Sequence, residues 1–450
     1  MLRLLEGSSV TLRNWLRSRV VGWLDAGMSG DLNVDGVEAV LAGAVGRLAD
    51  PGFLVNADPE EVLGLVDAAS GPAGRFAGAV YRASAHLHRD AGAGVRRQLL
   101  ALDAARYGDR GLAARITAVP VEGEPAAQWG VEWATGGMVD RSLWQTLAGH
   151  TSSVVGVATG VVEGRPVAVT SSRDETVRVW DLATGRQVGQ PLTGHIFGVI
   201  GVATGVVDGC PVAVTGGADE TVRVWDLTTG QPVGEPLHEH TNWVRAVATA
   251  VVDGCPVAVT GDYDGTVWVW DLTTREQIGE PLQERFRSDV EAVATGVVDG
   301  RPVAVTLTDG GGMVRVWDLA TREQIGEPLR THTGPVYGMA MGVVDGRPVA
   351  VTGSGDGTVR VWDLTTRQPI GEPLTCHTDS VGAVATGVVD GRPVAVTGSV
   401  DKTVRVWDLT TGRPAGPKLV FPAEVHAVAV TSDGRPVVGF GHEVAVLARR

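Results

Sequence analysis

Apolar residues in the C-terminal two thirds of the chain fall into short runs that alternate with polar turns. Within residues 150–194 these runs are 154–158, 166–170, 176–180 and 187–192, and Gly, Pro and Asp separate them. Short runs rich in β-branched residues and bounded by such turn residues predict antiparallel strands. We therefore expect four short strands in this segment.

The same pattern recurs along the chain with a fixed period. The pair Trp-Asp stands at 180–181, 225–226, 270–271, 317–318, 362–363 and 407–408, so the spacings are 45, 45, 47, 45 and 45. A fixed period of this size indicates stacked supersecondary units. Four antiparallel strands per unit is the pattern of a propeller blade. We number the blades 1 to 6 by these pairs.

The number of blades follows from the C-terminal end. Six complete units run from 150 to about 418, and a seventh offers only three strands, at 425–431, 435–440 and 443–447. We expect the missing strand to come from residues 142–148, because closing the ring removes its exposed edges. The prediction is a mainly β chain with a seven-bladed propeller over 121–450.

Residues 1–120 predict a small all-α domain. Apolar residues recur every three or four positions in 12–24, 37–48, 73–88, 94–107 and 110–116. Asp58, followed by Pro59, Glu60 and Glu61, is a typical helix start, and residues 50–52 (Asp-Pro-Gly) predict a break. Residues 119–125 look like a linker.

The repeats resemble the WD repeat family over residues 129–450. The matching features are Gly-His at 149–150 and 194–195, an Asp six residues before the Trp of most repeats, and the Trp-Asp ending. One departure is a stretched loop between the first two strands, Ala-Thr-Gly-Val-Val-Asp-Gly-Arg-Pro. The resemblance implies a propeller that serves as a non-catalytic scaffold for protein interactions.

It also implies a buried hydrogen-bonded set of His, Thr, Asp and Trp in each regular blade. The members are His150, Thr170, Asp174, Trp180; His195, Thr215, Asp219, Trp225; His240, Thr260, Asp264, Trp270; His332, Thr352, Asp356, Trp362; and His377, Thr397, Asp401, Trp407. In blades 4 and 7, Phe286 and Phe421 replace the His, and Gly311 and Gly441 replace the Asp. Losing both together avoids an unpaired buried polar group. Repetition in five blades favours architecture over a catalytic triad.

Composition and motif spacing argue against several classes of function. The net charge is -14, which disfavours binding to nucleic acid or to anionic membranes. Neither lysine follows a glycine, so there is no P-loop, and no Cys-x-x-Cys pair suggests a metal. One Asp per Val-Val-Asp-Gly turn is too few oxygens for calcium. We expect no cofactor, no metal, no enzymatic activity and a cytoplasmic, monomeric protein that binds other proteins.

Comparison of the near-identical repeats points to a partner surface on one rim of the ring, the top face. Variation is concentrated after the Gly-His pair and just before the turn Asp. Aromatic and Arg side chains, which are frequent anchors of interfaces, occupy these places at Phe197, Trp243, Tyr263, Trp268, Arg285 and Arg287. Drift at unconstrained positions is the competing interpretation. An acidic propeller favours a partner with basic patches.

The N-terminal region suggests an alternative role. Residues 49–58 (Ala-Asp-Pro-Gly-Phe-Leu-Val-Asn-Ala-Asp) and the helices after them are similar to the helical bridge of bacterial signal-transduction ATPases that carry C-terminal WD repeats. This chain has no ATPase motif. The resemblance implies the regulatory half of a system whose ATPase or effector is another chain. Some propellers are enzymes, but no catalytic constellation is distinguishable here.

Overall fold

The computed structural model describes residues 46–68, 72–134, 149–283, 289–308, 312–330, 332, 334–375 and 377–449. The chain divides into two compact units, residues 1–146 and residues 147–449. The first is mainly helical and the second is all β.

The described part of the helical unit contains η1 (Arg47–Ala49), α4 (Pro51–Asn56), α5 (Pro59–Ala68), α6 (Pro72–Ala83), α7 (Ala85–His88), α8 (Ala93–Arg106) and α9 (Arg110–Thr117). The helices predicted at 94–107 and 110–116 match α8 and α9 to within a residue or two, whereas the one predicted at 73–88 is divided into α6 and α7. Asp58 caps α5 by accepting a hydrogen bond from the backbone N–H of Glu60 at 2.8 Å. The expected break at 50–52 is instead the start of α4, capped by Asp50. The predicted helix at 12–24 and most of that at 37–48 lie outside the described residues.

No helix in the described ranges is both long enough and apolar enough to cross a membrane.

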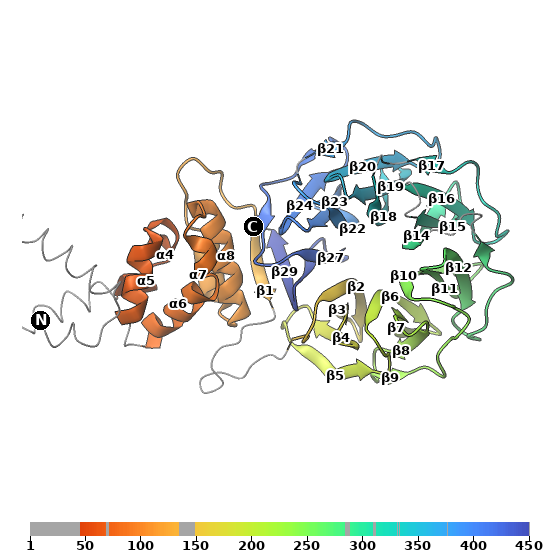
Figure 1. The fold of residues 1–450 in the computed structure, drawn as a ribbon, viewed down its shortest axis with the longest axis horizontal. Coiled ribbons are helices and arrows are strands. Elements are labelled where there is room, and N and C mark those ends of the chain that lie inside the picture. The colour runs from red at the N-terminus through yellow and green to blue at the C-terminus, as the bar shows by residue number, and fades with distance from the viewer. Residues whose placement is uncertain are drawn as a thin grey trace, which may run out of the picture. The chain divides into compact units, whose positions relative to one another are not determined.

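The strands form a ring of seven β-sheets (Figure 1), and residues 147–449 contribute every strand of it except β1 (Trp129–Ala134). Blades 1 to 3 consist of β2 (Val154–Val162), β3 (Arg165–Ser172), β4 (Thr176–Asp181) and β5 (Gln187–Thr193); β6 (Val199–Val207), β7 (Cys210–Gly217), β8 (Val222–Asp226) and β9 (Gln231–Pro232); and β10 (Val244–Val252), β11 (Cys255–Asp262), β12 (Thr266–Asp271) and β13 (Leu282–Gln283).

Blades 4 to 6 repeat this order. They consist of β14 (Val290–Val298), β15 (Arg301–Thr308), β16 (Met313–Asp318) and β17 (Leu329–Arg330); β18 (Val336–Val344), β19 (Arg347–Ser354), β20 (Thr358–Asp363) and β21 (Leu374–Thr375); and β22 (Val381–Val389), β23 (Arg392–Ser399), β24 (Thr403–Asp408), β25 (Arg413–Pro414) and β26 (Leu419–Val420). The first strand of each blade lines the centre of the ring (Figure 1).

The seventh sheet corrects one prediction. Its order is β1-β29-β28-β27, with β27 (Val425–Val430), β28 (Pro436–Phe440) and β29 (Glu443–Arg449) from the C-terminal end. The fourth strand is β1 (Trp129–Ala134), not residues 142–148, which lie outside the described residues. Trp129 and Trp133 lie four residues apart, so they face one side of the strand, and both are buried. This apolar pair marks the strand better than the single Trp of 142–148 does.

A second correction concerns the loop between the first two strands of each blade. The residues Ala-Thr-Gly-Val-Val continue the first strand, which pairs with the second up to the turn: in blade 1, Val162 lies opposite Arg165. The turn has only two residues, Glu163 and Gly164, with φ of 49° and 76°. This is the geometry of a tight hairpin turn with both central residues left-handed. The sequence insertion therefore lengthens the hairpin instead of adding a loop.

Threonine hydroxyls in the first strands join neighbouring blades around the ring. Thr204 donates to the carbonyl oxygen of Thr159 at 2.7 Å, Thr249 to Thr204 at 2.6 Å, and Thr295 to Thr249 at 2.6 Å. Thr159 donates to the carbonyl of Val430 at 3.2 Å, which links blade 1 to blade 7, and Thr386 donates to that of Met341. These bonds are repeated because the repeat itself places Thr there.

The core lies between blades and is built mainly from Val. One buried cluster combines Val169 and Val177 of blade 1 with Trp225 and Leu227 of blade 2, and the other blades show equivalent clusters. Each Trp of a Trp-Asp pair thus packs on the valines of the preceding blade. Burying these Val and Trp side chains accounts for most of the stabilisation, at about 25 cal/mol per Å² of apolar surface.

Candidate functional site: a cavity at one end of the ring

The predicted buried set is a chain of hydrogen bonds in blade 1. The indole N–H of Trp180 donates to the Thr170 hydroxyl at 2.9 Å, and that hydroxyl lies 2.8 Å from Nε2 of His150. Nδ1 of His150 lies 2.9 Å from Asp174. A neutral imidazole with its proton on Nδ1 gives every member a partner. Asp174 also accepts the backbone N–H of Thr151 at 2.9 Å, which ties two loops together.

Blades 2 and 6 repeat this arrangement, and blade 3 alters it. The predicted partner of His240 was Asp264, but Nδ1 of His240 lies 2.7 Å from Asp262. Asp262 stands where blades 1, 5 and 6 carry Ser, blade 2 carries Gly, blade 4 carries Thr and blade 7 carries Phe. It is fully buried and accepts the backbone N–H of Thr266 at 2.9 Å. It reaches the histidine from the end of the strand. Asp264 instead accepts hydrogen bonds from Thr241 and Asn242.

The remaining blades are incomplete in different ways. In blade 5 Asp356 is 3.6 Å from His332, and the Trp362 indole has no hydrogen-bond partner among the described residues. Blade 4 keeps the bond from Trp317 to Thr306 at 3.0 Å, but Phe286 and Gly311 lie outside the described residues. In blade 7 Phe421 packs against Phe440 with ring centroids 5.0 Å apart, so apolar contact takes the place of the polar set.

Burial and hydrogen bonding shift the pKa values of these groups in a consistent way. Burial lowers the pKa of His150, His332 and His377, and the carboxylates beside them offset this only in part. Burial alone would raise the pKa of Asp174, but the hydrogen bonds from His150, Thr176 and the Thr151 backbone outweigh it and lower that pKa. In blades 1, 5 and 6 the set therefore holds a neutral His and an ionised Asp. All of its members are structural, and none faces a cavity.

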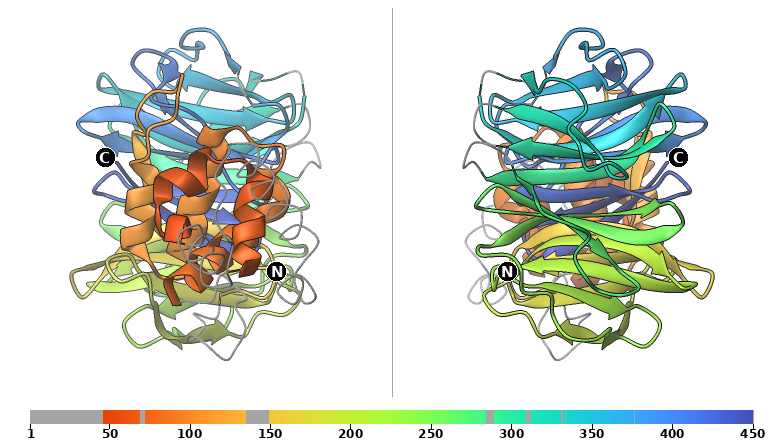
Figure 2. Two further views of the ribbon diagram at one scale, coloured as in Figure 1. Left: turned by 90° about the vertical axis from the view of Figure 1, so that its left-hand side faces the viewer. Right: turned by 90° about the vertical axis from the view of Figure 1, so that its right-hand side faces the viewer.

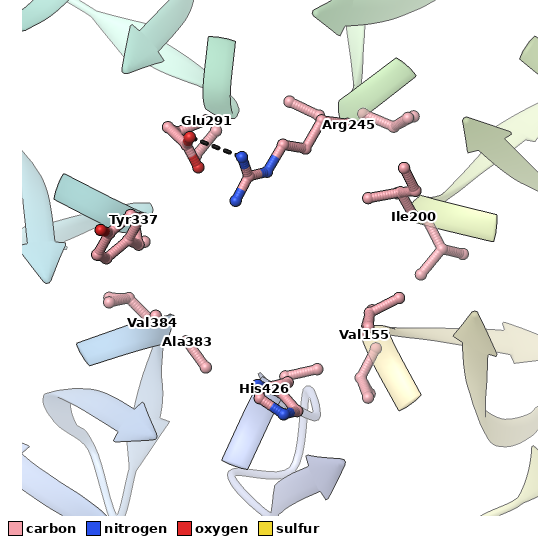
Figure 3. A pocket seen from close by; sticks show the side chains of 18 of the residues that line it. Val155, Ile200, Arg245, Glu291, Tyr337, Ala383, Val384 and His426 are labelled. Atoms are coloured by element: carbon pink, nitrogen blue, oxygen red, sulfur yellow. Dashed lines mark hydrogen bonds and ion pairs between the residues drawn. The ribbon is translucent and has the colours of Figure 1, made fainter. Parts of the chain in front are cut away.

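A cavity of about 780 Å³ opens at the centre of the ring and is lined by all seven blades. Each blade contributes the second residue of its first strand. We call these residues the channel ring: Val155, Ile200, Arg245, Glu291, Tyr337, Gly382 and His426. Figure 3 shows six of them around the opening.

A β-bulge places each channel-ring residue in the cavity. In every first strand the pairing shifts register across this residue, for example between Val154 and Gly156. A bulge re-aims the extra side chain. Strict alternation along the strand does not predict this shift at Val155, so the residue pattern alone did not indicate the channel ring. The available signal was that seven equivalent positions carry seven different residues within near-identical repeats.

Three of the six residues predicted to bind a partner line the same cavity: Phe197, Trp243 and Tyr263. Trp268 does not, because it is half-buried, packs against the core cluster between blades 2 and 3, and has its ring centroid 5.9 Å from that of Trp270. Arg285 and Arg287 lie outside the described residues.

The blade 3 side of the cavity carries a connected cluster. Trp243 and Tyr263 meet edge to face with centroids 5.6 Å apart. The Arg245 guanidinium lies 5.6 Å from the Tyr263 ring centroid and pairs with Glu291 of blade 4 at 2.6 Å. The Glu291 side chain is only 3% exposed, whereas that of Arg245 is 29% exposed. Arg245 therefore neutralises a buried carboxylate and presents the rest of its guanidinium to the opening (Figure 3).

Phe197 is the most exposed aromatic residue described, at 76%, and its φ is 68°. A bulky side chain in the left-handed region is strained. Gly198 follows with φ of 100°, and a Cβ there would lie 3.3 Å from the Cα of Arg173. Backbone strain of this kind gathers at functional sites. The loop thus holds an aromatic side chain in water beside the cavity, at a cost in backbone energy.

The helical unit contains a buried polar cluster of its own. The Ser84 hydroxyl donates to Asp103 at 2.5 Å and lies 2.8 Å from Nε2 of His88. All three side chains are buried, and burial lowers the pKa of His88 to about 4. His86, two residues away, is exposed, as their spacing on a helix predicts. Because the serine is sealed in the core and already donates to a carboxylate, the trio joins α8 to α7 instead of forming a nucleophile.

The seven sheets, the repeated buried set and the central cavity define a seven-bladed β-propeller. Five segments match the family described as WD domain, G-beta repeat, at residues 141–181, 186–226, 230–271, 323–363 and 367–408. The propeller of this chain therefore carries WD repeats. Residues 272–322, which hold β14, β15 and β16 of the altered blade 4, lie outside these matches. No curated protein matches the chain.

Proposed function

We propose that this protein is a non-catalytic scaffold that binds another protein at the cavity end of its propeller. The observation that carries the proposal is the coincidence of variation with the cavity. The positions that differ between repeats include the channel ring and the loop residues Gly198, Trp243 and Tyr263, and all of these line the cavity. The WD-repeat fold is a typical scaffold for protein interactions, which supports the same conclusion.

Drift at unconstrained positions explains this pattern less well. At the opposite end of the blades, exposed residues stay the same in all six long repeats: Val206, Val251 and Val297 are examples, each more than half exposed. Exposure has therefore produced little variation at that end, where Cys210 and Cys255 in place of Arg are exceptions. Diversity concentrated at the cavity end favours a surface adapted to a particular partner.

The experiment uses two substitutions that the repeats themselves supply. Trp243→Ser gives blade 3 the residue of blade 1 at Ser153, and Tyr263→Ala gives it that of blade 2 at Ala218, so the fold has already accepted both. We expect the double variant of the full chain to lose its co-purified partner, with affinity reduced at least tenfold, because buried aromatic anchors contribute about 2 kcal/mol or more each. A Val188→Thr variant serves as the matched control, because Val188 is an exposed valine of the outer strand β5 and is not among the residues that line the cavity. Equal capture by the wild type and the double variant would contradict the proposal.

A second candidate is the regulatory half of a bacterial signal-transduction ATPase system, and residues 49–58 with the helices α5 to α9 support it. In that case a neighbouring reading frame encodes a protein with a P-loop, and the two chains co-purify. Absence of such a frame, or failure of the two proteins to co-purify, argues against this role and leaves the scaffold role standing.

A further inference from the structure

Six exposed valines follow the end of the ring opposite the cavity. They are Val161, Val206, Val251, Val297, Val343 and Val388, and between 53% and 64% of each is exposed. Each is the eighth residue of a first strand, while the channel-ring residue is the second. Six residues along a strand separate the two positions by about 20 Å. The strands of every blade run between the two faces of the ring (Figure 2), so these side chains form an arc on the far face. We call it the valine arc.

Folding does not require an apolar residue at these positions. The next residue in blade 1, Val162, is buried and supports the hairpin, whereas Val161 is in water. Thr has a comparable preference for strands and the same branching. Exposed apolar residues scattered singly need no explanation, but a continuous row of them marks an interaction surface. Because the six first strands are neighbours around the ring, these valines follow one another in a row from blade to blade.

The charge beside the arc is negative. Each of the six hairpin turns carries an exposed carboxylate: Glu163, Asp208, Asp253, Asp299, Asp345 and Asp390. The nearby Arg side chains are also exposed, at 65% for Arg301 and 72% for Arg392, but each pairs with the Asp of a Trp-Asp pair: Arg301 lies 3.6 Å from Asp318 and Arg392 lies 3.7 Å from Asp408. Two carboxylates to one guanidinium leave these blades negative beside the arc.

Blades 2 and 3 are the most negative part of the arc. Cys210 and Cys255 take the place of that Arg, and both are exposed free thiols. Asp226 and Asp271 therefore lack the cation that the other repeats place beside them. The surface over Val206, Val251 and Val297 combines exposed apolar side chains with an excess of carboxylates.

We propose that the valine arc over blades 2 to 4 is a second binding surface, and that its partner is an amphipathic helix whose apolar stripe is flanked by Lys and Arg. The apolar stripe covers the valines and the cations meet the turn carboxylates, which is complementary in both respects. A second copy of this chain does not fit, because two equal rings of carboxylates would face each other. This surface is independent of the cavity.

The test uses the full chain and a synthetic 18-residue helix of Leu and Lys in an amphipathic pattern, labelled for fluorescence anisotropy. We expect saturable binding that weakens with added salt. The triple variant Val206→Thr, Val251→Thr, Val297→Thr should bind at least tenfold more weakly, because it keeps shape and strand preference but removes apolar surface. Cys210→Arg with Cys255→Arg, which restores the arrangement of the other blades, should weaken binding by about threefold to tenfold.

Trp243→Ser is the matched control at the cavity and should leave the affinity for the helix unchanged, so failure here is distinguishable from failure of the proposed function. Equal binding by the triple threonine variant would overturn the proposal. So would equal binding of a Leu-Glu helix of the same pattern. Sedimentation of the two proteins gives a further test. If the wild type is a dimer and the triple threonine variant is a monomer, the arc binds a second copy of the chain, and the proposal is overturned.

Discussion

At the scale of single residues, Asp262 of blade 3 makes hydrogen bonds that two side chains, Ser172 and Asp174, make in blade 1. In blade 1 the Ser172 hydroxyl accepts the backbone N–H of Asp174 at 3.1 Å, and Asp174 itself holds the histidine. In blade 3 Asp262 accepts the equivalent N–H, of Asp264, at 3.0 Å, and also bonds to His240. Asp264 is then left to bind the neighbouring loop.

This predicts a compensating pair. Asp262→Ser gives blade 3 the Ser-x-Asp pattern of blade 5, so Asp264 can replace the lost carboxylate and we expect a loss below about 1 kcal/mol. Asp264→Ala alone should cost equally little. The double substitution leaves His240 without an acceptor, and we expect it to exceed the sum of the single effects by about 1–2 kcal/mol. Urea unfolding of the four proteins measures this, and simple additivity would contradict the assignment.

A second prediction concerns acid. The folded pKa values of His150, His332 and His377 are below the ordinary value of about 6.5, so the unfolded chain takes up protons first as the pH falls. The free energy of unfolding should therefore be constant above about pH 6.5 and decrease below it. Asp174, Asp219 and Asp401 also have lowered pKa values, so a further decrease follows below about pH 4.

Urea unfolding of the propeller at pH 7.5, 5.5 and 4.0 checks this sign. The matched control is His150→Phe with Asp174→Gly, the residues that blade 7 carries at 421 and 441, and it should show a shallower dependence between pH 6.5 and 5. Stability that stays flat or increases between pH 7.5 and 5 would show that the histidines are not buried in the neutral form.

At the scale of elements, the long hairpins depend on one backbone geometry. Gly254 has a φ of 86°, and a Cβ added there would meet no atom within 4 Å. Gly254→Ala therefore tests backbone strain without a steric clash, and we expect a loss of about 1–2 kcal/mol. Asp253→Asn should be neutral, because Asn also tolerates the left-handed region. Thermal unfolding of both variants is the measurement, and equal melting temperatures would contradict the turn assignment.

Sequence patterns predicted most elements and missed those with irregular backbone. Period-two runs located the strands, and α8 and α9 lie within a residue or two of their expected ends. The glycine in Ala-Thr-Gly-Val-Val suggested a loop because it resembles a turn signal, but it lies in a paired strand. The channel ring was missed because a β-bulge interrupts the alternation of side chains along the strand, and no residue type at these positions predicts the bulge. Asp262 was missed because a two-residue shift along the strand end still reaches the same histidine.

At the scale of the whole propeller, the residues that repeat and the residues that vary lie in different places. The same buried residues recur from blade to blade, while the channel ring differs in every one. A change at the ring is therefore tolerated where its neighbours do not depend on it, as at Ile200 or Gly382. Arg245 is the exception, because it forms an ion pair with the buried Glu291 at 2.6 Å. Substitutions designed to alter binding must change these two together.

The threonine bonds between first strands have a mechanical consequence. Met341 and Val430 occupy the position of the donating Thr in blades 5 and 7, and neither side chain has a hydroxyl. We call this series of threonine hydrogen bonds the belt. It is interrupted at two places, between blades 4 and 5 and between blades 6 and 7. Met341→Thr and Val430→Thr would each extend the belt by one link, and native-state hydrogen exchange should show slower opening of β18 and β27. Under force or heat, the propeller should part at these joints before any other.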